Sequence, residues 1–121
     1  MRLLLLILVT AALPAAEHTG TAVFYSNILH GRPTADGGVY DKDALTAAHA
    51  TLPYGTQVRV TNLANERSVV VRVTDRMGTK GPLIEVSGRA ASELGFVRRG
   101  RARVRVEVLP EAAAAGVSPS S

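Results

Sequence analysis

Two polar side chains stand at the ends of apolar segments and have the chemistry for a shared site. His49 closes the segment 45–49, and Asp75 lies near the end of the strongly apolar run 68–76. An imidazole titrates near neutral pH, and a neighbouring carboxylate orients the ring and shifts its pKa. A carboxyl group at the rim of an apolar core can have a raised pKa and act as a general acid. His49 and Asp75 are therefore candidate catalytic residues.

Each of these residues also has a structural explanation. Asp75 is followed by Arg76 and, two positions later, by Gly78, so its carboxylate could cap a turn or pair with the arginine. His49 could be a hydrogen-bonded histidine at the edge of the core. No metal site is expected, because the histidines have neither HxxxH spacing nor a cysteine partner.

The elements that would position these residues have the patterns of short β-strands. Valines alternate with charged residues over 104–108, which is typical of a strand with one buried face. The same alternation covers 57–61. The nearly continuous β-branched run 69–73 predicts a central strand buried on both sides, and Asn65-Glu66 fits a hairpin turn before it. Shorter strands are expected at 21–25 and 83–86.

Short helices complete the predicted domain. Ser87 is a suitable N-cap and Gly95 a suitable end for a helix between them, and 41–48 could form one or two helical turns. About six short strands with one or two short helices give a mainly β fold. A closed small barrel is the expected architecture, because an open sandwich of this size would expose strand edges.

The termini differ in composition from this domain. Residues 1–16 combine a short positive start, an apolar run over 3–13 and small residues, as in a secretory signal peptide. A linker is expected at 17–19, the folded domain at 20–110 and a disordered tail at 111–121. The protein is expected to be exported to the periplasm or cell envelope. The apolar run is too short for stable membrane insertion, and without cysteine no lipid anchor is expected.

Composition restricts the class of partner. The chain has no cysteine, a net charge of +4 and only 4% aromatic residues. Single-strand nucleic-acid binding uses aromatic stacking among basic residues, so nucleic acid is not expected. The mild positive charge fits binding to an anionic envelope glycan. The protein is expected to be a monomer, and no cofactor is expected. The arginines at 98, 99, 101, 103 and 105 are interpreted as a solvated face, or alternatively as a dock for such a glycan. The glycine-rich segment 29–38 is either a binding loop or a plain connection.

Several ordered segments together resemble one protein family. They are Gly20-Thr-Ala-Val-Phe-Tyr25, His30-Gly-Arg-Pro-Thr-Ala-Asp-Gly37, Ala44-Leu-Thr-Ala-Ala-His49, Val58-Arg-Val-Thr-Asn-Leu63 and Arg67-Ser-Val-Val-Val-Arg-Val-Thr-Asp-Arg76. The chain resembles, over about residues 20–109, the bacterial rare lipoprotein A group of double-psi β-barrel proteins.

The resemblance implies a six-stranded double-psi β-barrel and an exported peptidoglycan lytic transglycosylase. Such an enzyme cleaves the glycan strand and closes a 1,6-anhydro ring, because a hydroxyl of the sugar replaces water. One carboxyl group can then serve first as acid and next as base, which relaxes the two-carboxylate requirement of glycosidases. The family pattern carries catalytic roles to Asp75 and His49. The resemblance also implies a substrate-binding groove; the residues expected to line it are Tyr25, Thr34, Asp36, Gly38 and Arg76.

Two departures from the family pattern bear on activity. Gly38 stands where the family has a glutamate, and Met77-Gly78-Thr79 replaces a Gly-Pro-aromatic sequence. Two hypotheses follow. The chain is a lytic transglycosylase with Asp75 as acid/base and His49 as its partner, or it is a catalytically impaired module that binds peptidoglycan through the same groove.

Overall fold

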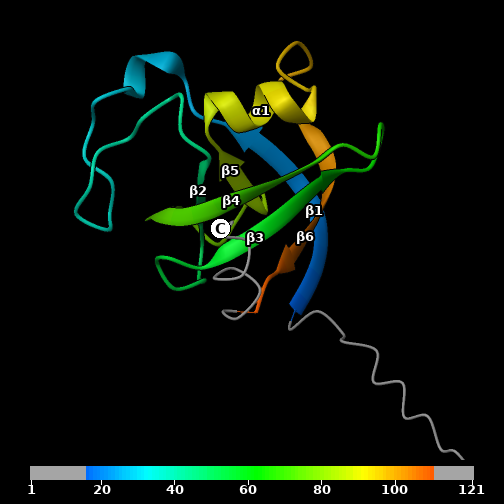
Figure 1. The fold of residues 1–121 in the computed structure, drawn as a ribbon, viewed down its shortest axis with the longest axis horizontal. Helices are drawn as coiled ribbons and strands as arrows, with labels where there is room; N and C mark the ends of the chain where they lie inside the picture. Colours follow the sequence, from blue (N-terminus) through cyan, green and yellow to red (C-terminus); the bar gives the residue numbers. More distant parts are fainter. Residues whose placement is uncertain (1–15, 111–121) are drawn as a thin grey trace, which may run out of the picture.

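The computed structural model describes residues 16–110, which form six strands, one α-helix and one short 3-10 helix (Figure 1). The strands are β1 (Ala16–Phe24), β2 (Thr46–His49), β3 (Gln57–Asn62), β4 (Ser68–Arg76), β5 (Ile84–Val86) and β6 (Ala102–Val108). The helices are η1 (Asn27–Leu29) and α1 (Gly88–Leu94). The proposed leader and the proposed tail lie almost entirely outside the described residues. No helix within 16–110 is both long and apolar enough to cross a membrane.

The six strands close into a barrel in the order β1-β5-β2-β4-β3-β6. The β1–β5 and β2–β4 pairs are parallel and the other four pairs are antiparallel. Closure leaves no sheet edge exposed, as the sequence argument requires. The mainly β, six-stranded barrel predicted from the sequence is confirmed.

The inward face of each strand supplies the core. Every second residue of β4 is buried, at Val69, Val71 and Val73, while Val70 is half-buried and Arg72 is exposed. The expectation that 69–73 is buried on both sides is therefore wrong. A barrel strand has one interior face, and the β-branched residues on its other face only pack against their neighbours.

Two boundaries also differ from expectation. The end of the segment 41–48, expected to form helical turns, belongs to the strand β2, because its backbone pairs with β4 on one side and β5 on the other. Residues 17–19, expected to form a linker, belong to β1, whose first residue Ala16 pairs with Val108 of β6. In both places pairing with distant strands determines the backbone, and local residue preference does not.

The helix and the hairpin turn follow the sequence prediction. The Ser87 hydroxyl accepts a hydrogen bond from the Ala90 amide, and Gly95 ends α1 in the left-handed region at φ 79°. Glu66 occupies the β3–β4 turn with φ 63°. Outside the main core, Tyr25, Tyr40 and Ala48 form a second buried cluster. Tyr25 joins this cluster to Asp75 through a hydrogen bond.

Candidate functional site

Asp75 is held rigidly near the end of β4. One carboxylate oxygen accepts a 2.6 Å hydrogen bond from the Tyr25 hydroxyl. The other accepts from the amides of Ala35 and Arg76, both at 2.9 Å. Figure 1 shows the arrow of β4 pointing toward the long loop after β1, from which the Ala35 amide comes. Three donors contact this carboxylate, so both of its oxygens accept hydrogen bonds and its orientation is fixed.

Tyr25, which contacts Asp75, is stacked on Tyr40. The rings of Tyr25 and Tyr40 are 4.3 Å apart at an interplanar angle of 14°. Burial and the hydrogen bond to Asp75 raise the pKa of Tyr25 far above its ordinary range. The Tyr25 hydroxyl therefore remains protonated and serves as a fixed donor to the carboxylate.

A second carboxyl group, Glu85, faces the same side of the barrel as Asp75. In the strand register Val23, Glu85, Ala48 and Asp75 follow one another across β1, β5, β2 and β4. Residues paired laterally in a sheet share a face, so Asp75 and Glu85 flank the small side chain of Ala48. Neighbouring strands are about 4.8 Å apart, which puts the two backbones about 10 Å apart.

The environment of Glu85 suits a proton donor. Burial raises the pKa of Glu85, and the negative charge of Asp75 raises it further. Asp75, in contrast, is surrounded by donors. Two carboxyl groups whose surroundings differ in this way can divide the roles of acid and charge stabiliser. Glu85 was not predicted from the sequence, because its only local signal is an isolated charge between the buried residues Ile84 and Val86.

His49 is buried, but its ring is already engaged by the loop that follows it. Its Nδ1 atom accepts hydrogen bonds from the amides of Thr51 and Leu52, each at 3.1 Å. Burial lowers the pKa of His49, and the positive charge of Arg76 lowers it further. The ring is thus neutral with its proton on Nε2. Among the described residues no hydrogen bond or ion pair joins His49 to Asp75, and the register pairs Asp75 with Ala48 instead.

Arg76 binds the same loop through its side chain. Its guanidinium donates to the carbonyls of His49 and Leu52, at 2.9 and 2.7 Å. It also lies 4.3 Å from the centre of the Tyr54 ring, in a cation–π contact. The side chain therefore holds loop 49–54 against the end of β4, next to Asp75.

The glycine-rich loop is locked to β4. The Asp36 amide donates to the carbonyl of Thr74, and Ala35 donates to Asp75. The Asp36 carboxylate accepts from the Thr34 hydroxyl at 2.6 Å and from the Gly38 amide at 3.0 Å. These bonds lower the pKa of Asp36. Asp36 is consequently an ionised structural residue of the loop, and a side chain at Gly38 would extend from beside it.

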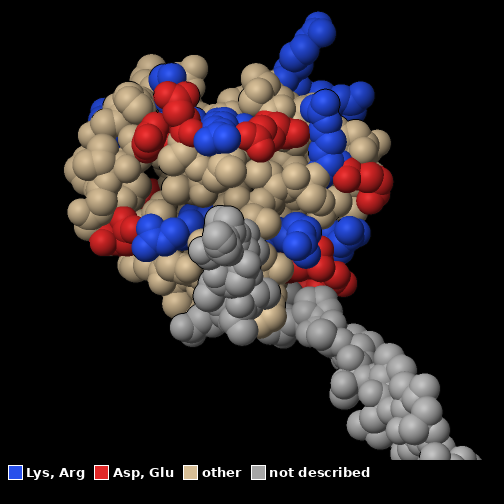
Figure 2. Space-filling model, in the orientation of Figure 1, with Lys and Arg blue, Asp and Glu red and all other residues tan. Residues whose placement is uncertain are grey.

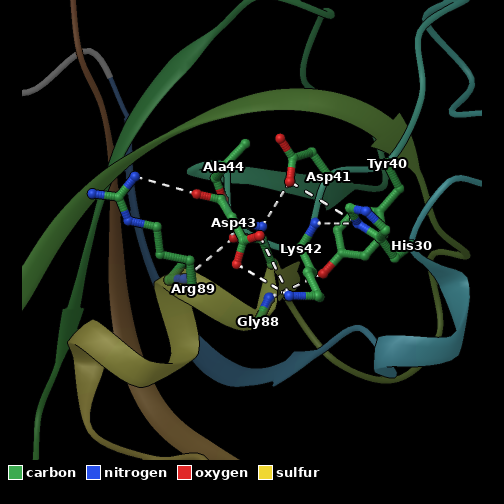
Figure 3. A network of polar contacts seen from close by, with 10 residues as sticks. His30, Tyr40, Asp41, Lys42, Asp43, Ala44, Gly88 and Arg89 are labelled. Carbon is green, nitrogen blue, oxygen red and sulfur yellow. Dashed lines mark hydrogen bonds and ion pairs between the residues drawn. The ribbon is translucent and has the colours of Figure 1, made fainter.

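The other end of this loop is fastened to α1, as Figure 3 shows. The Tyr40 hydroxyl accepts from the Gly88 amide at 3.0 Å, and the Arg89 amide donates to the carbonyl of Lys42 at 2.9 Å. The Lys42 amide donates to Nδ1 of His30. The loop is thus fixed at both ends, which gives the site a preformed wall. Within residues 16–110 no group of three or more potential ligands is placed to hold a metal ion.

The sequence matches a family profile described as lytic transglycolase over residues 17–106. Two similar curated proteins are both named endolytic peptidoglycan transglycosylase RlpA. The protein from Neisseria meningitidis is 51% identical over 90 residues, covering 74% of this chain and 38% of its own length. The protein from Pseudomonas aeruginosa strain UCBPP-PA14 is 50% identical over 98 residues, covering 77% and 28%. The chain therefore spans about a third of the length of these relatives.

Solved structures agree on the fold. A Streptomyces papain inhibitor aligns with a TM-score of 0.64 at 21% identity, over 80% of this chain and 97% of the inhibitor. A mutant Clavibacter michiganensis expansin in complex with cellohexaose aligns with a TM-score of 0.63 at 20% identity, over 79% and 52%. The expected double-psi β-barrel is confirmed, and the chain belongs to the RlpA-like lytic transglycolase family.

Proposed function

We propose that this protein is an endolytic peptidoglycan transglycosylase, which cleaves glycan strands with formation of a 1,6-anhydro ring and so contributes to cell wall organisation. Membership of the lytic transglycolase family supports the reaction class. The observation that carries the proposal is the pair of carboxyl groups on either side of Ala48, one surrounded by donors and one with a raised pKa.

In the proposed reaction Glu85 is the acid. Its proton passes to the glycosidic oxygen as the bond from that oxygen to the anomeric carbon breaks. The hydroxyl on carbon 6 of the same sugar then bonds to the anomeric carbon, and its proton returns to the Glu85 carboxylate. No water enters, so the products together have the composition of the substrate. A side chain that donates and then accepts a proton needs a pKa nearer neutrality than that of an ordinary glutamate.

Asp75 supplies fixed negative charge in this scheme. The anomeric carbon becomes positive as the bond breaks, and an ionised carboxylate that is already oriented stabilises that charge without rearrangement. The same charge adds to the effect of burial in raising the pKa of Glu85. Asp75 thus stays a catalytic residue, but its role changes from the acid/base expected from the sequence to charge stabiliser, and Glu85 replaces His49 as its partner. His49 and Arg76 act as positioning residues, because both are engaged with loop 49–54.

We further propose that the protein acts as a monomer on peptidoglycan in the cell envelope, after export directed by residues 1–16. The apolar composition of residues 3–13 supports export. Asp75, Glu85 and the tyrosines come from one chain, which supports action as a monomer. Fractionation of cells that produce a tagged protein tests the location, and size-exclusion chromatography tests the oligomeric state.

One observation favours a second candidate function. Gly38 brings no carboxyl group to the loop, where a Cβ would lie 3.2 Å from an Asp36 oxygen. If the missing glutamate is essential, the groove binds peptidoglycan without cleaving it.

Digestion of purified sacculi distinguishes the two functions. The purified protein is incubated with sacculi, and released fragments are analysed by mass spectrometry for anhydro ends. The enzyme proposal expects such ends, and it expects their loss in Asp75→Asn with the thermal unfolding transition still present. Binding to sacculi without anhydro ends, even at high protein concentration, would instead establish the binding module.

A further inference from the structure

A rigid arginine-rich turn joins α1 to β6 on the far side of the barrel from Asp75. The buried ring of Phe96 anchors it, and the Phe96 carbonyl accepts hydrogen bonds from the amides of Arg99 and Gly100. Gly100 closes the turn with φ 79°. The exposed side chains of Arg98, Arg99 and Arg101 therefore project from a fixed backbone, and Arg103 follows on β6.

Three of these arginines, Arg99, Arg101 and Arg103, line a hollow. This cavity of about 530 Å³ lies between the turn, β1 and the end of β3, and no acidic residue lines it. Its polar lining residues are Thr21, Asn62, Asn65, Arg99, Arg101 and Arg103. Figure 2 shows Lys and Arg side chains gathered at the upper right of the molecule, where Figure 1 places the turn after α1.

The arginines of this surface lack counter-charges. Two exposed cations elsewhere are paired, Arg89 with Glu93 at 2.8 Å and Lys42 with Asp43 at 3.3 Å. Within residues 16–110, no ion pair or side-chain hydrogen bond involves the arginines at positions 98, 99, 101 and 103. Like charges held close together repel one another, and an anionic ligand would relieve that repulsion.

The position of this surface separates it from the proposed catalytic groove. Following the closed order of strands, β6 lies opposite β2, and the cavity is lined by residues of β1, β3 and β6. The proposed catalytic pair, in contrast, lies on β4 and β5, and Asp75 is at the opposite end of β4 from Ser68, which pairs with Thr61 beside the cavity residue Asn62. A ligand on the arginine surface would therefore not occupy the groove.

We propose that the arginine surface, defined by Arg98, Arg99, Arg101 and Arg103, binds the carboxylate groups of peptidoglycan peptide stems and holds a second part of the wall during cleavage. This inference rests on the proposed function for its choice of polymer. A guanidinium binds carboxylate through two parallel hydrogen bonds, and several arginines match a polymer that repeats the carboxylate. Phe96, the only aromatic residue in the cavity, is 1% exposed, so no stacking platform for nucleic-acid bases is present there.

Binding to sacculi tests the proposal independently of cleavage. The full chain is sedimented with sacculi freed of secondary polymers, before and after their carboxyl groups are coupled to a neutral amine by carbodiimide. We expect binding to weaken about fivefold after this amidation, and to weaken with added salt. Equal binding to both preparations would overturn the proposal, whether or not anhydro ends are produced.

A matched pair of variants locates the effect. Arg99→Gln with Arg101→Gln removes two charges from the cavity, while Arg59→Gln with Lys80→Gln removes two exposed charges elsewhere. Only the first variant should lose the preference for unmodified sacculi. A loss in both, or in neither, would contradict a specific surface. If the first variant instead loses binding only to vesicles of anionic phospholipid, the partner is a lipid surface and the proposal is wrong.

Discussion

Replacing Glu85 with glutamine separates proton donation from every other property of this side chain. The amide has the same size and still forms hydrogen bonds, but it cannot supply the proton for the leaving oxygen. General acid–base catalysis contributes about a hundredfold to ten-thousandfold to rates, which corresponds to about 3–5 kcal/mol of barrier. We expect the rate of anhydro-end formation to fall by this factor.

The same substitution has an opposite effect on stability. The folded protein retains the Glu85 proton to higher pH than the unfolded chain, whose glutamate titrates near 4.5. Between these two pKa values the folded state binds more protons, so the contribution of this group to stability falls as pH rises. Glu85→Gln removes this loss, and the variant should gain stability relative to wild type as the pH is raised above about 4.5.

Two assays measure these effects on one variant. Quantified anhydro muropeptides give the rate, and urea unfolding at several pH values gives the stability. In addition, an NMR titration of the Glu85 carboxyl carbon should have a lower midpoint in Asp75→Asn, because the neighbouring charge is absent. Wild-type rates in Glu85→Gln would refute the assignment of the acid, and an unchanged midpoint in Asp75→Asn would refute the coupling between the two carboxyl groups.

Three further substitutions probe the rest of the site. Tyr25→Phe removes the 2.6 Å hydrogen bond to Asp75 and should cost about 2 kcal/mol in urea unfolding; no change would mean that the bond contributes nothing. Gly38→Glu should raise the release of anhydro ends severalfold, and the Asp36 side chain must move slightly to make room for the new Cβ. No gain in activity would indicate that the loop after Arg76 also limits activity. His49→Asn should weaken stability by about 1 kcal/mol at pH 7. It should also reduce the loss of stability between pH 7 and 5, since the lowered pKa of His49 lets only the unfolded chain bind a proton near pH 6.5. An unchanged pH dependence would contradict that lowered pKa.

The strands with strong alternation could be predicted from the sequence, while those defined by their partners could not. Residues 104–108 carry their buried face in their own pattern. The strand 46–49 contains two alanines and no alternation, so only its pairing with β4 and β5 makes it extended. Local sequence lacks this information, because the partners lie more than twenty residues away along the chain.

The candidate site could be predicted only in part, because some of its residues depend on contacts with distant segments. Asp75 could be singled out because it ends a long apolar run, and its contacts with Tyr25 and Ala35 join it to two other segments. Glu85 gave no comparable signal, because its significance depends on a register that places Ala48 between it and Asp75. His49 could be recognised as buried, but the use of its Nδ1 by the following turn depends on the path of that turn.

Digestion of sacculi in water enriched in oxygen-18 tests the central claim most directly. In the proposed reaction the sugar's own hydroxyl attacks the anomeric carbon, so the new ends should be anhydro sugars without the heavy isotope. These ends should disappear in Glu85→Gln. Reducing ends that carry oxygen-18 would show hydrolysis instead and would contradict the account.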